Sequence, residues 1–173
     1  MLNHRLRLVI EAAECIMLTL LIVGTAGLVG LKIWGGQLLS VQTASMSPTI
    51  QPKDAVIVKP TPADELHVGD IISYHSPNQP KMVITHRVIS IDRQARQLIT
   101  AGDALHTKDP SFSEQLLVGR VVALTPRLGL IIDFLHRPIG LISAIYLPAA
   151  LIIASEVDHI AYAYARPFYS VRL

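Results

Sequence analysis

The sequence predicts a compact, mostly β domain that is tethered to a membrane by an apolar helix on each side of it. Three observations support this fold class. The chain has 173 residues, of which 51% are hydrophobic and only 16% charged, and its mean hydropathy of +0.45 is high for a soluble domain. Two long apolar stretches lie near its ends, and short β-branched runs bounded by turn residues fill the sequence between them.

The first apolar stretch runs from Cys15 to Trp34 and is interrupted only by Lys32. About 20 apolar residues in a helix span the roughly 30 Å hydrocarbon core of a bilayer. Lys32 can extend toward the lipid headgroups, where Trp34 is also favoured. A cleaved secretory signal would have a shorter apolar run followed by a small-x-small site. Because Gly35-Gly36-Gln37 follows instead, we expect an uncleaved anchor.

The second apolar stretch, Ile139 to Ala154, contains no charged residue. Pro148 lies inside it and would kink a helix, which membrane-spanning helices tolerate. A buried core helix or an interfacial hairpin is the alternative interpretation. We expect a second transmembrane helix.

The stretch between them reads as a series of short strands, because runs of four to eight residues rich in Val, Ile and Thr alternate with turn residues. The strand candidates are Ala55–Val58, Asp70–Tyr74, Met82–Thr85, Val88–Ile91, Gln97–Thr100 and Leu117–Leu124.

These observations divide the chain into an N-terminal flank (1–12), an anchor (13–34), a β domain (35–137), a second transmembrane helix (138–155) and a C-terminal tail (156–173). His4, Arg5 and Arg7 precede the anchor, which favours a cytoplasmic N-terminus. Loops longer than about 60 residues cross the membrane largely regardless of charge. We therefore expect an integral protein of the cell membrane with its β domain on the extracytoplasmic or lumenal face.

Charge and cysteine content exclude several classes of function. The net charge of +2 is small and scattered, so no nucleic-acid partner is predicted. The single Cys15 excludes an internal disulfide, and no Cys/His cluster has the spacing of a zinc site. The sequence thus predicts neither a metal nor another cofactor.

The residues for serine-based hydrolysis are present, although each is common when taken alone. Such chemistry needs a nucleophilic hydroxyl, a base and a group that orients the base. Ser45 lies in a turn-rich run, His86 lies between two strand candidates, and Asp103 and Asp109 lie in one polar loop. A loop serine is usually only solvated, a strand histidine is usually packed, and an aspartate after glycine is usually a turn residue. Spacing alone therefore does not identify an enzyme.

The order of these motifs resembles that of the type I signal peptidases. Ser45–Ile50 resembles the Ser-Met-x-Pro-Thr box, which follows an N-terminal anchor in that family. The other matching segments are Gly69–Ile72 (the Gly-Asp-Val/Ile box), Thr85–Ile89 (the second catalytic box), Gly102–Asp109 (the third box) and Gly119–Val122 (the closing strand).

This resemblance implies a membrane-bound serine endopeptidase that cleaves signal peptides from exported preproteins without a cofactor. It implies Ser45 as nucleophile and His86 as general base. Asp109 would orient His86, and Asp103 is a support or the alternative third member. The typical bacterial branch uses lysine as the base, whereas His86-Arg87 resembles the endoplasmic-reticulum-type branch of archaea, some Gram-positive bacteria and the endoplasmic reticulum.

One position departs from the family pattern. An Asn usually follows the first Asp of the third box, but Ala104-Leu105-His106 stands here, so that polar contact is in doubt. Arg87 is expected on the strand face opposite His86 and therefore to be structural. His67, His75 and His106 are expected to be surface residues, with His106 of interest because it lies in the aspartate loop.

The short distance from the anchor to Ser45 places the expected active site near the lipid. Ten extended residues after Trp34 reach only about 35 Å. A membrane-inserted signal peptide could pair as an extended strand with a free sheet edge and place its small side chains in shallow pockets. We expect Leu38, Leu39, Met46 and Ile50 to line these pockets or to enter the membrane interface. The expected partners are preprotein signal peptides and the lipid bilayer, and the need for accessory subunits is open.

Two other functions are compatible with parts of the sequence. A noncatalytic assembly or peptide-binding protein with a retained peptidase fold would fit Leu105, but not the joint retention of Ser45, His86, Asp103 and Asp109. A self-cleaving regulator of the related Ser–Lys clan would be soluble and would carry lysine at the position of His86. The physiological substrate, whether of general secretion, pilin processing or a dedicated matrix or spore protein, is open.

Overall fold

The computed structural model describes residues 4–105 and 107–165. The chain forms two compact units. One comprises Val29–Asp133, and the other comprises Met1–Leu28 together with Phe134–Leu173. The first unit contains the β domain and the second contains most of the two long helices, and each is described by itself.

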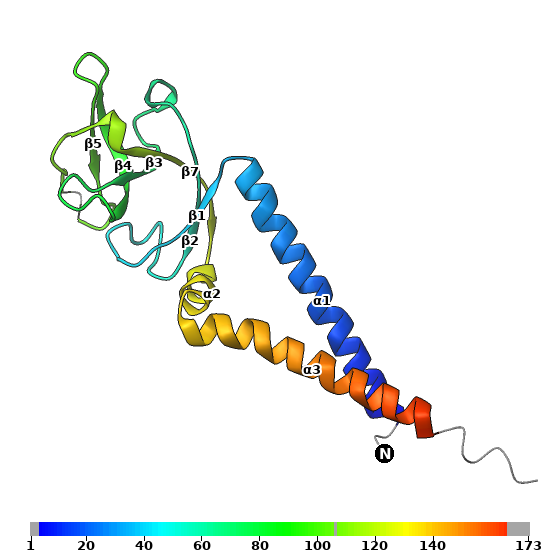
Figure 1. The fold of residues 1–173 in the computed structure, drawn as a ribbon. Coiled ribbons are helices and arrows are strands. Elements are labelled where there is room, and N and C mark those ends of the chain that lie inside the picture. Colours follow the sequence, from blue (N-terminus) through cyan, green and yellow to red (C-terminus); the bar gives the residue numbers. More distant parts are fainter. Residues whose placement is uncertain (1–3, 106, 166–173) are drawn as a thin grey trace, which may run out of the picture. The chain divides into compact units, whose positions relative to one another are not determined.

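Two long helices flank the β domain in the sequence, α1 (His4–Ile33) and α3 (Pro138–Ala165), and a short helix α2 (Leu128–Leu135) precedes α3 (Figure 1). Within α1 and α3, Leu8–Ile33 and Pro138–Val157 are long and apolar enough to cross a membrane. Almost none of their side chains is buried within the structure. Pro148 lies inside α3 without ending it. The predicted apolar helix on each side of the β domain is therefore confirmed.

The β domain is a single seven-stranded sheet in the order β1-β2-β7-β3-β4-β5-β6, and every neighbouring pair is antiparallel. This confirms the predicted mostly β fold. Two 3-10 turns, Ala63–Glu65 and Glu114–Leu116, interrupt the connections. The strands are β1 (Gln37–Ser40), β2 (Ala55–Lys59), β3 (Ile71–His75), β4 (Val83–Asp92), β5 (Gln97–Ala101), β6 (Phe112–Ser113) and β7 (Leu117–Thr125).

The two strand candidates on either side of His86 are one continuous strand, β4. Its first half pairs with β3, where Val83 to Arg87 oppose His75 to Ile71. Its second half pairs with β5 along the other edge, beginning at Arg87 opposite Ala101. His86 is therefore the last residue of β4 before the pairing with β5 begins.

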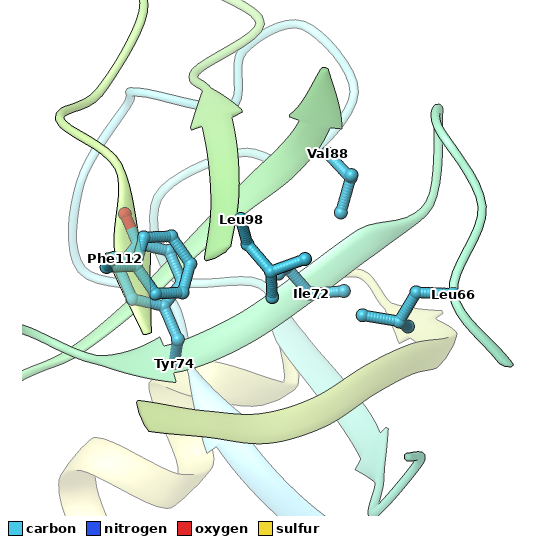
Figure 2. Packing of buried hydrophobic residues seen from close by; sticks show 6 residues of the cluster. All are labelled: Leu66, Ile72, Tyr74, Val88, Leu98 and Phe112. Carbon is cyan, nitrogen blue, oxygen red and sulfur yellow. The ribbon is translucent and has the colours of Figure 1, made fainter. Parts of the chain in front are cut away.

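One hydrophobic cluster packs between strands β3, β4, β5 and β6. Figure 2 shows how its side chains converge, and the Tyr74 and Phe112 rings stack with centroids 3.9 Å apart. Fully burying one such side chain contributes roughly 1.5–3 kcal/mol to folding. The members of the cluster are Leu66, Ile72, Tyr74, Val88, Leu98 and Phe112.

A second cluster packs under the loop between β1 and β2, which carries Ser45. Val41, Met46, Ile50, Val56 and Val58 form it, and Met46 and Ile50 are each 1% exposed. The expectation that Met46 and Ile50 line a substrate pocket or enter the membrane interface is therefore wrong. Their burial instead anchors the loop immediately after Ser45.

Asp54 fastens the far end of this loop. Its Oδ2 accepts a hydrogen bond from the Gln51 backbone N–H (2.9 Å), and its Oδ1 accepts one from the Arg127 N–H (3.0 Å). These backbone donors, with Arg127 first, hold the pKa of the Asp54 carboxyl below its usual range. The carboxylate thus joins the loop to the segment that leads into α2.

Tyr74 gives the β domain a specific dependence on alkaline pH. Burial raises the pKa of Tyr74 to about 12, whereas an unfolded tyrosine ionises near pH 10. The contribution of the protonated Tyr74 to the free energy of unfolding is therefore fully present below pH 10. It is lost as the pH rises from 10 toward 12, at about 1 kcal/mol per pH unit. Thermal unfolding of the full chain at pH 8 to 11.5 measures this. A Tyr74→Phe variant with the same alkaline slope would contradict the assignment.

Candidate active site

Ser45 lies half-buried in the loop between β1 and β2. Its Oγ is 3.3 Å from the Thr43 Oγ1, and its backbone carbonyl accepts a hydrogen bond from the Ala104 N–H at 2.9 Å. The next residue, Met46, is buried in the second cluster. The main chain at Ser45 is thus held from both sides, while its hydroxyl borders a cleft.

His86 and Asp109 form a short polar contact beside the Ser45 loop. The distance from His86 Nδ1 to Asp109 Oδ2 is 2.6 Å, and the two side chains are 14% and 24% exposed. Because a carboxylate only accepts hydrogen bonds, Nδ1 carries the proton in this pair. In a neutral imidazole, Nε2 is then left as a proton acceptor.

Gly102 brings the Ser45 loop and the His86 ring together. A Cβ atom at this position would lie 2.6 Å from the Ser45 carbonyl oxygen and 3.3 Å from His86 Nε2. Both groups therefore border the space that a side chain here would occupy. The absence of a side chain at Gly102 is what lets the two segments approach each other.

Asp103 has different partners from Asp109. Arg87 donates to both of its oxygens, from Nε at 2.9 Å and from a terminal nitrogen at 2.7 Å, and the Thr49 hydroxyl donates at 2.6 Å. The hydrogen bond to Asp103 raises the pKa of the Arg87 guanidinium. Because Thr49 belongs to the Ser45 loop, Asp103 ties that loop to β4. The structure thus places Asp109, and not Asp103, in contact with His86.

The remaining candidates lie as follows. His67 is 4.0 Å from an Asp70 oxygen, and His75 Nδ1 contacts the Pro80 carbonyl at 2.8 Å. Leu105 is 81% exposed. His106 lies outside the described residues.

A cleft of about 580 Å³ borders Ser45 and His86. One wall is residues 39–43 with Ser45, and the other is residues 81–86. Both walls have backbone edges without a strand partner among the described residues. β1 pairs only with β2, and Val83 to His86 pair only with β3. Such edges are ready to pair with an added extended chain.

Sequence reasoning missed the contacts that Tyr74 and Thr100 make with Asp109. The Thr100 hydroxyl donates to Asp109 Oδ2 at 2.6 Å, and the Tyr74 hydroxyl donates to the same atom at 3.3 Å. One signal was present, because Thr100 follows Leu98 at strand spacing and so occupies a core-facing position. A hydroxyl at such a position needs a buried partner.

This arrangement supplies a hydroxyl, an imidazole whose acceptor nitrogen borders the same space at Gly102 as the Ser45 main chain, and a carboxylate at the other ring nitrogen. Comparison with known families agrees with these features. The family model described as signal peptidase, peptidase S26, matches residues 11–127. The matched range includes Ser45, His86, Asp103 and Asp109. No individual curated protein gives a significant match to the chain.

Proposed function

Because the chain belongs to the signal peptidase family, peptidase S26, we propose that it is a membrane-bound serine endopeptidase that removes N-terminal signal peptides from exported preproteins. The observation that carries the proposal is the 2.6 Å contact between His86 and Asp109. It leaves the other ring nitrogen facing the space at Gly102 that the Ser45 main chain also borders. His86 followed by Arg87 supports the endoplasmic-reticulum-type branch within the family.

In the proposed reaction, the Ser45 hydroxyl attacks the scissile carbonyl while His86 Nε2 takes its proton. Asp109 holds the ring in the required tautomer and stabilises the imidazolium that forms. The imidazolium then protonates the leaving amine, and a water molecule attacks the acyl-enzyme with His86 again as base. We assign the Ser45 backbone N–H as an oxyanion donor. Thr43 holds the Ser45 hydroxyl through their 3.3 Å contact.

The substrate in this proposal is an extended peptide that lies in the cleft between residues 39–43 and 81–86. Its backbone would pair with the free edges of the two walls. The cleft is partly apolar, with Leu39 and Ile84 among its lining residues. These features support the choice of small side chains next to the scissile bond, as signal peptides have.

The proposed location is the cell membrane, with α1 and α3 crossing the bilayer and residues 35–137 on the extracytoplasmic or lumenal face. Residues 1–12 and 156–173 are then cytoplasmic. Two helices of suitable length and composition support this arrangement, as do the basic residues before α1. Only Trp34–Gly36 separate α1 from β1. A short connection of this kind would keep Ser45 near the membrane surface.

Cleavage of a preprotein by membranes that contain the full chain tests the proposal. His86→Ala is expected to lower the cleavage rate by about 10³- to 10⁶-fold, because the hydroxyl loses its proton acceptor. His75→Ala is the matched control, since its ring nitrogen contacts the Pro80 carbonyl in the loop between β3 and β4 and the proposed chemistry does not use this residue. Mapping the N-termini of membrane and secreted proteins identifies the substrates. If the His86 variant cleaves like the parent, the chain is a noncatalytic member of the family or uses another mechanism.

The two aspartates are expected to affect different properties. Asp109→Ala is expected to lower kcat by about 10³- to 10⁴-fold, because it removes the partner of His86. Asp103→Ala leaves Arg87 without its bidentate partner and is expected to destabilise the fold by about 1–3 kcal/mol. Cleavage rates and thermal unfolding of both variants measure this. A larger kcat loss in the Asp103 variant would reverse the assignment.

A further inference from the structure

We propose that Thr100 and Tyr74 are positioning residues that hold the Asp109 carboxylate in the orientation His86 requires. Their hydroxyls and the His86 Nδ1–H all converge on one atom, Asp109 Oδ2. This inference rests on the proposed function, because it assigns Thr100 and Tyr74 a part in that same reaction.

Thr100 holds Asp109 at two points. Its hydroxyl donates to Oδ2 at 2.6 Å, and its backbone carbonyl accepts the Asp109 N–H at 2.8 Å. Thr100 is fully buried, with 0% of its surface exposed, and lies in β5. One residue thus fixes both the main chain and the carboxylate of Asp109. Thr100, two residues before Gly102, is thus bonded directly to Asp109, the partner of His86.

Tyr74 approaches the same oxygen from β3. Its hydroxyl donates to Oδ2 at 3.3 Å, and its ring is 2% exposed. The ring stacks on Phe112 with an interplanar angle of 12°, and both rings belong to the cluster in Figure 2. Because Phe112 follows Asp109 by three residues, the stack also holds the chain just after Asp109. Burial raises the pKa of Tyr74 to about 12, so the hydroxyl keeps its proton and donates throughout the neutral range.

The Thr100 and Tyr74 hydroxyls hold the Asp109 carboxylate in a fixed position, which its own loop does not provide. Asp109 follows an irregular loop, and its side chain is 24% exposed. A carboxylate in that setting can rotate or pair with water. Donors that are themselves buried do not move with the loop, so they fix Oδ2 relative to β4, where His86 lies. Displacement of a catalytic group by about 1 Å can cost 10²-fold in rate.

The substitution Thr100→Val keeps the shape of the side chain and removes the donor. It is expected to lower kcat by about 10- to 100-fold with little change in KM, because orientation and not substrate binding is affected. Thr100→Ser restores the hydroxyl and is expected to recover most of the rate. Tyr74→Phe is expected to cost less, about 3- to 10-fold, because its hydrogen bond is longer.

A double-mutant comparison separates positioning from a purely structural role. If Thr100 acts through Asp109, Thr100→Val has little further effect on kcat in an Asp109→Ala background. A structural role would lower the rate by the same factor in both backgrounds and would not be rescued by serine once unfolding temperatures are matched. Either of these results overturns the inference.

The same assay distinguishes this inference from the proposed function. When the parent cleaves, His86→Ala does not, and Thr100→Val keeps the parental kcat, the proposed function stands and the inference fails. When the parent does not cleave a preprotein, or His86→Ala cleaves like the parent, the proposed function fails and the inference fails with it.

Discussion

Replacing Ser45 by alanine is expected to lower the rate of preprotein cleavage by about 10⁴- to 10⁶-fold. Loss of the nucleophilic hydroxyl in a Ser–His–Asp arrangement removes nearly all of the catalytic advantage and leaves only substrate positioning and oxyanion stabilisation. The side chain is half-buried and belongs to neither hydrophobic cluster. The unfolding temperature should therefore stay close to that of the parent. Quantitative cleavage of a radiolabelled preprotein in membranes measures the rate.

Ser47→Ala is the matched control for this variant. Ser47 lies two residues further along the same loop, and its hydroxyl donates a 3.3 Å hydrogen bond to the Gln51 side chain. The proposed chemistry does not use it, so its loss is expected to change the rate by less than about 3-fold. If the Ser47 variant were inactive and the Ser45 variant active, Ser47 and not Ser45 would be the nucleophile. Equal activity in both would exclude a serine nucleophile in this loop.

Gly102→Ala is expected to abolish activity through sterics alone. The added methyl group would lie 2.6 Å from the Ser45 carbonyl oxygen, a backbone atom that cannot move without the loop, and 3.3 Å from His86 Nε2. The backbone of Gly102 is not in the left-handed region, so alanine can adopt its conformation. We expect the loop to be displaced, with a cleavage loss of at least about 100-fold and a destabilisation of about 1–3 kcal/mol.

The control for this steric effect is Gly27→Ala in α1, where the added carbon meets no heavy atom within 4 Å apart from the adjacent residues and the backbone of its own helix. That variant is expected to cleave at the parental rate. The comparison uses cleavage and thermal unfolding of the two full-length variants. Parental activity in the Gly102 variant would show that the space beside His86 is not needed for catalysis.

Much of the β domain could be predicted because its strands carry their own signals. β2, β3, β5 and β7 coincide with β-branched runs bounded by turns, and hydropathy alone indicates the two long helices. β1 and β6 were not predicted, since four-residue and two-residue strands show no period of their own and depend on their partners. Met46 and Ile50 were misplaced for a related reason. The sequence does not distinguish an apolar loop residue that is buried in the domain from one that faces lipid.

In the candidate site, too, the sequence identifies the residues but not the side-chain contacts between them. Ser45, His86, Asp103 and Asp109 are recognisable from the order of their motifs, but the choice between the two aspartates depends on a contact across the sheet. Asp103 pairs with Arg87 and Asp109 with His86, which becomes visible only when the chain has folded. Thr100 and Tyr74 were missed because their polar atoms meet Asp109 only after three strands have assembled.

The change of neighbours along β4 has a consequence for which proteins could be cut. Among the residues that the structure describes, no strand pairs with one row of backbone groups of residues 83–86, beside the loop that carries Ser45. A chain can use that row only if it is already unfolded over several residues and has amide hydrogens to offer. Proline at an inward-facing amide position would remove a donor and block docking. Under the proposed function, segments already folded into helices or compact domains would not be cut, and cleavage would have to precede folding of the exported protein.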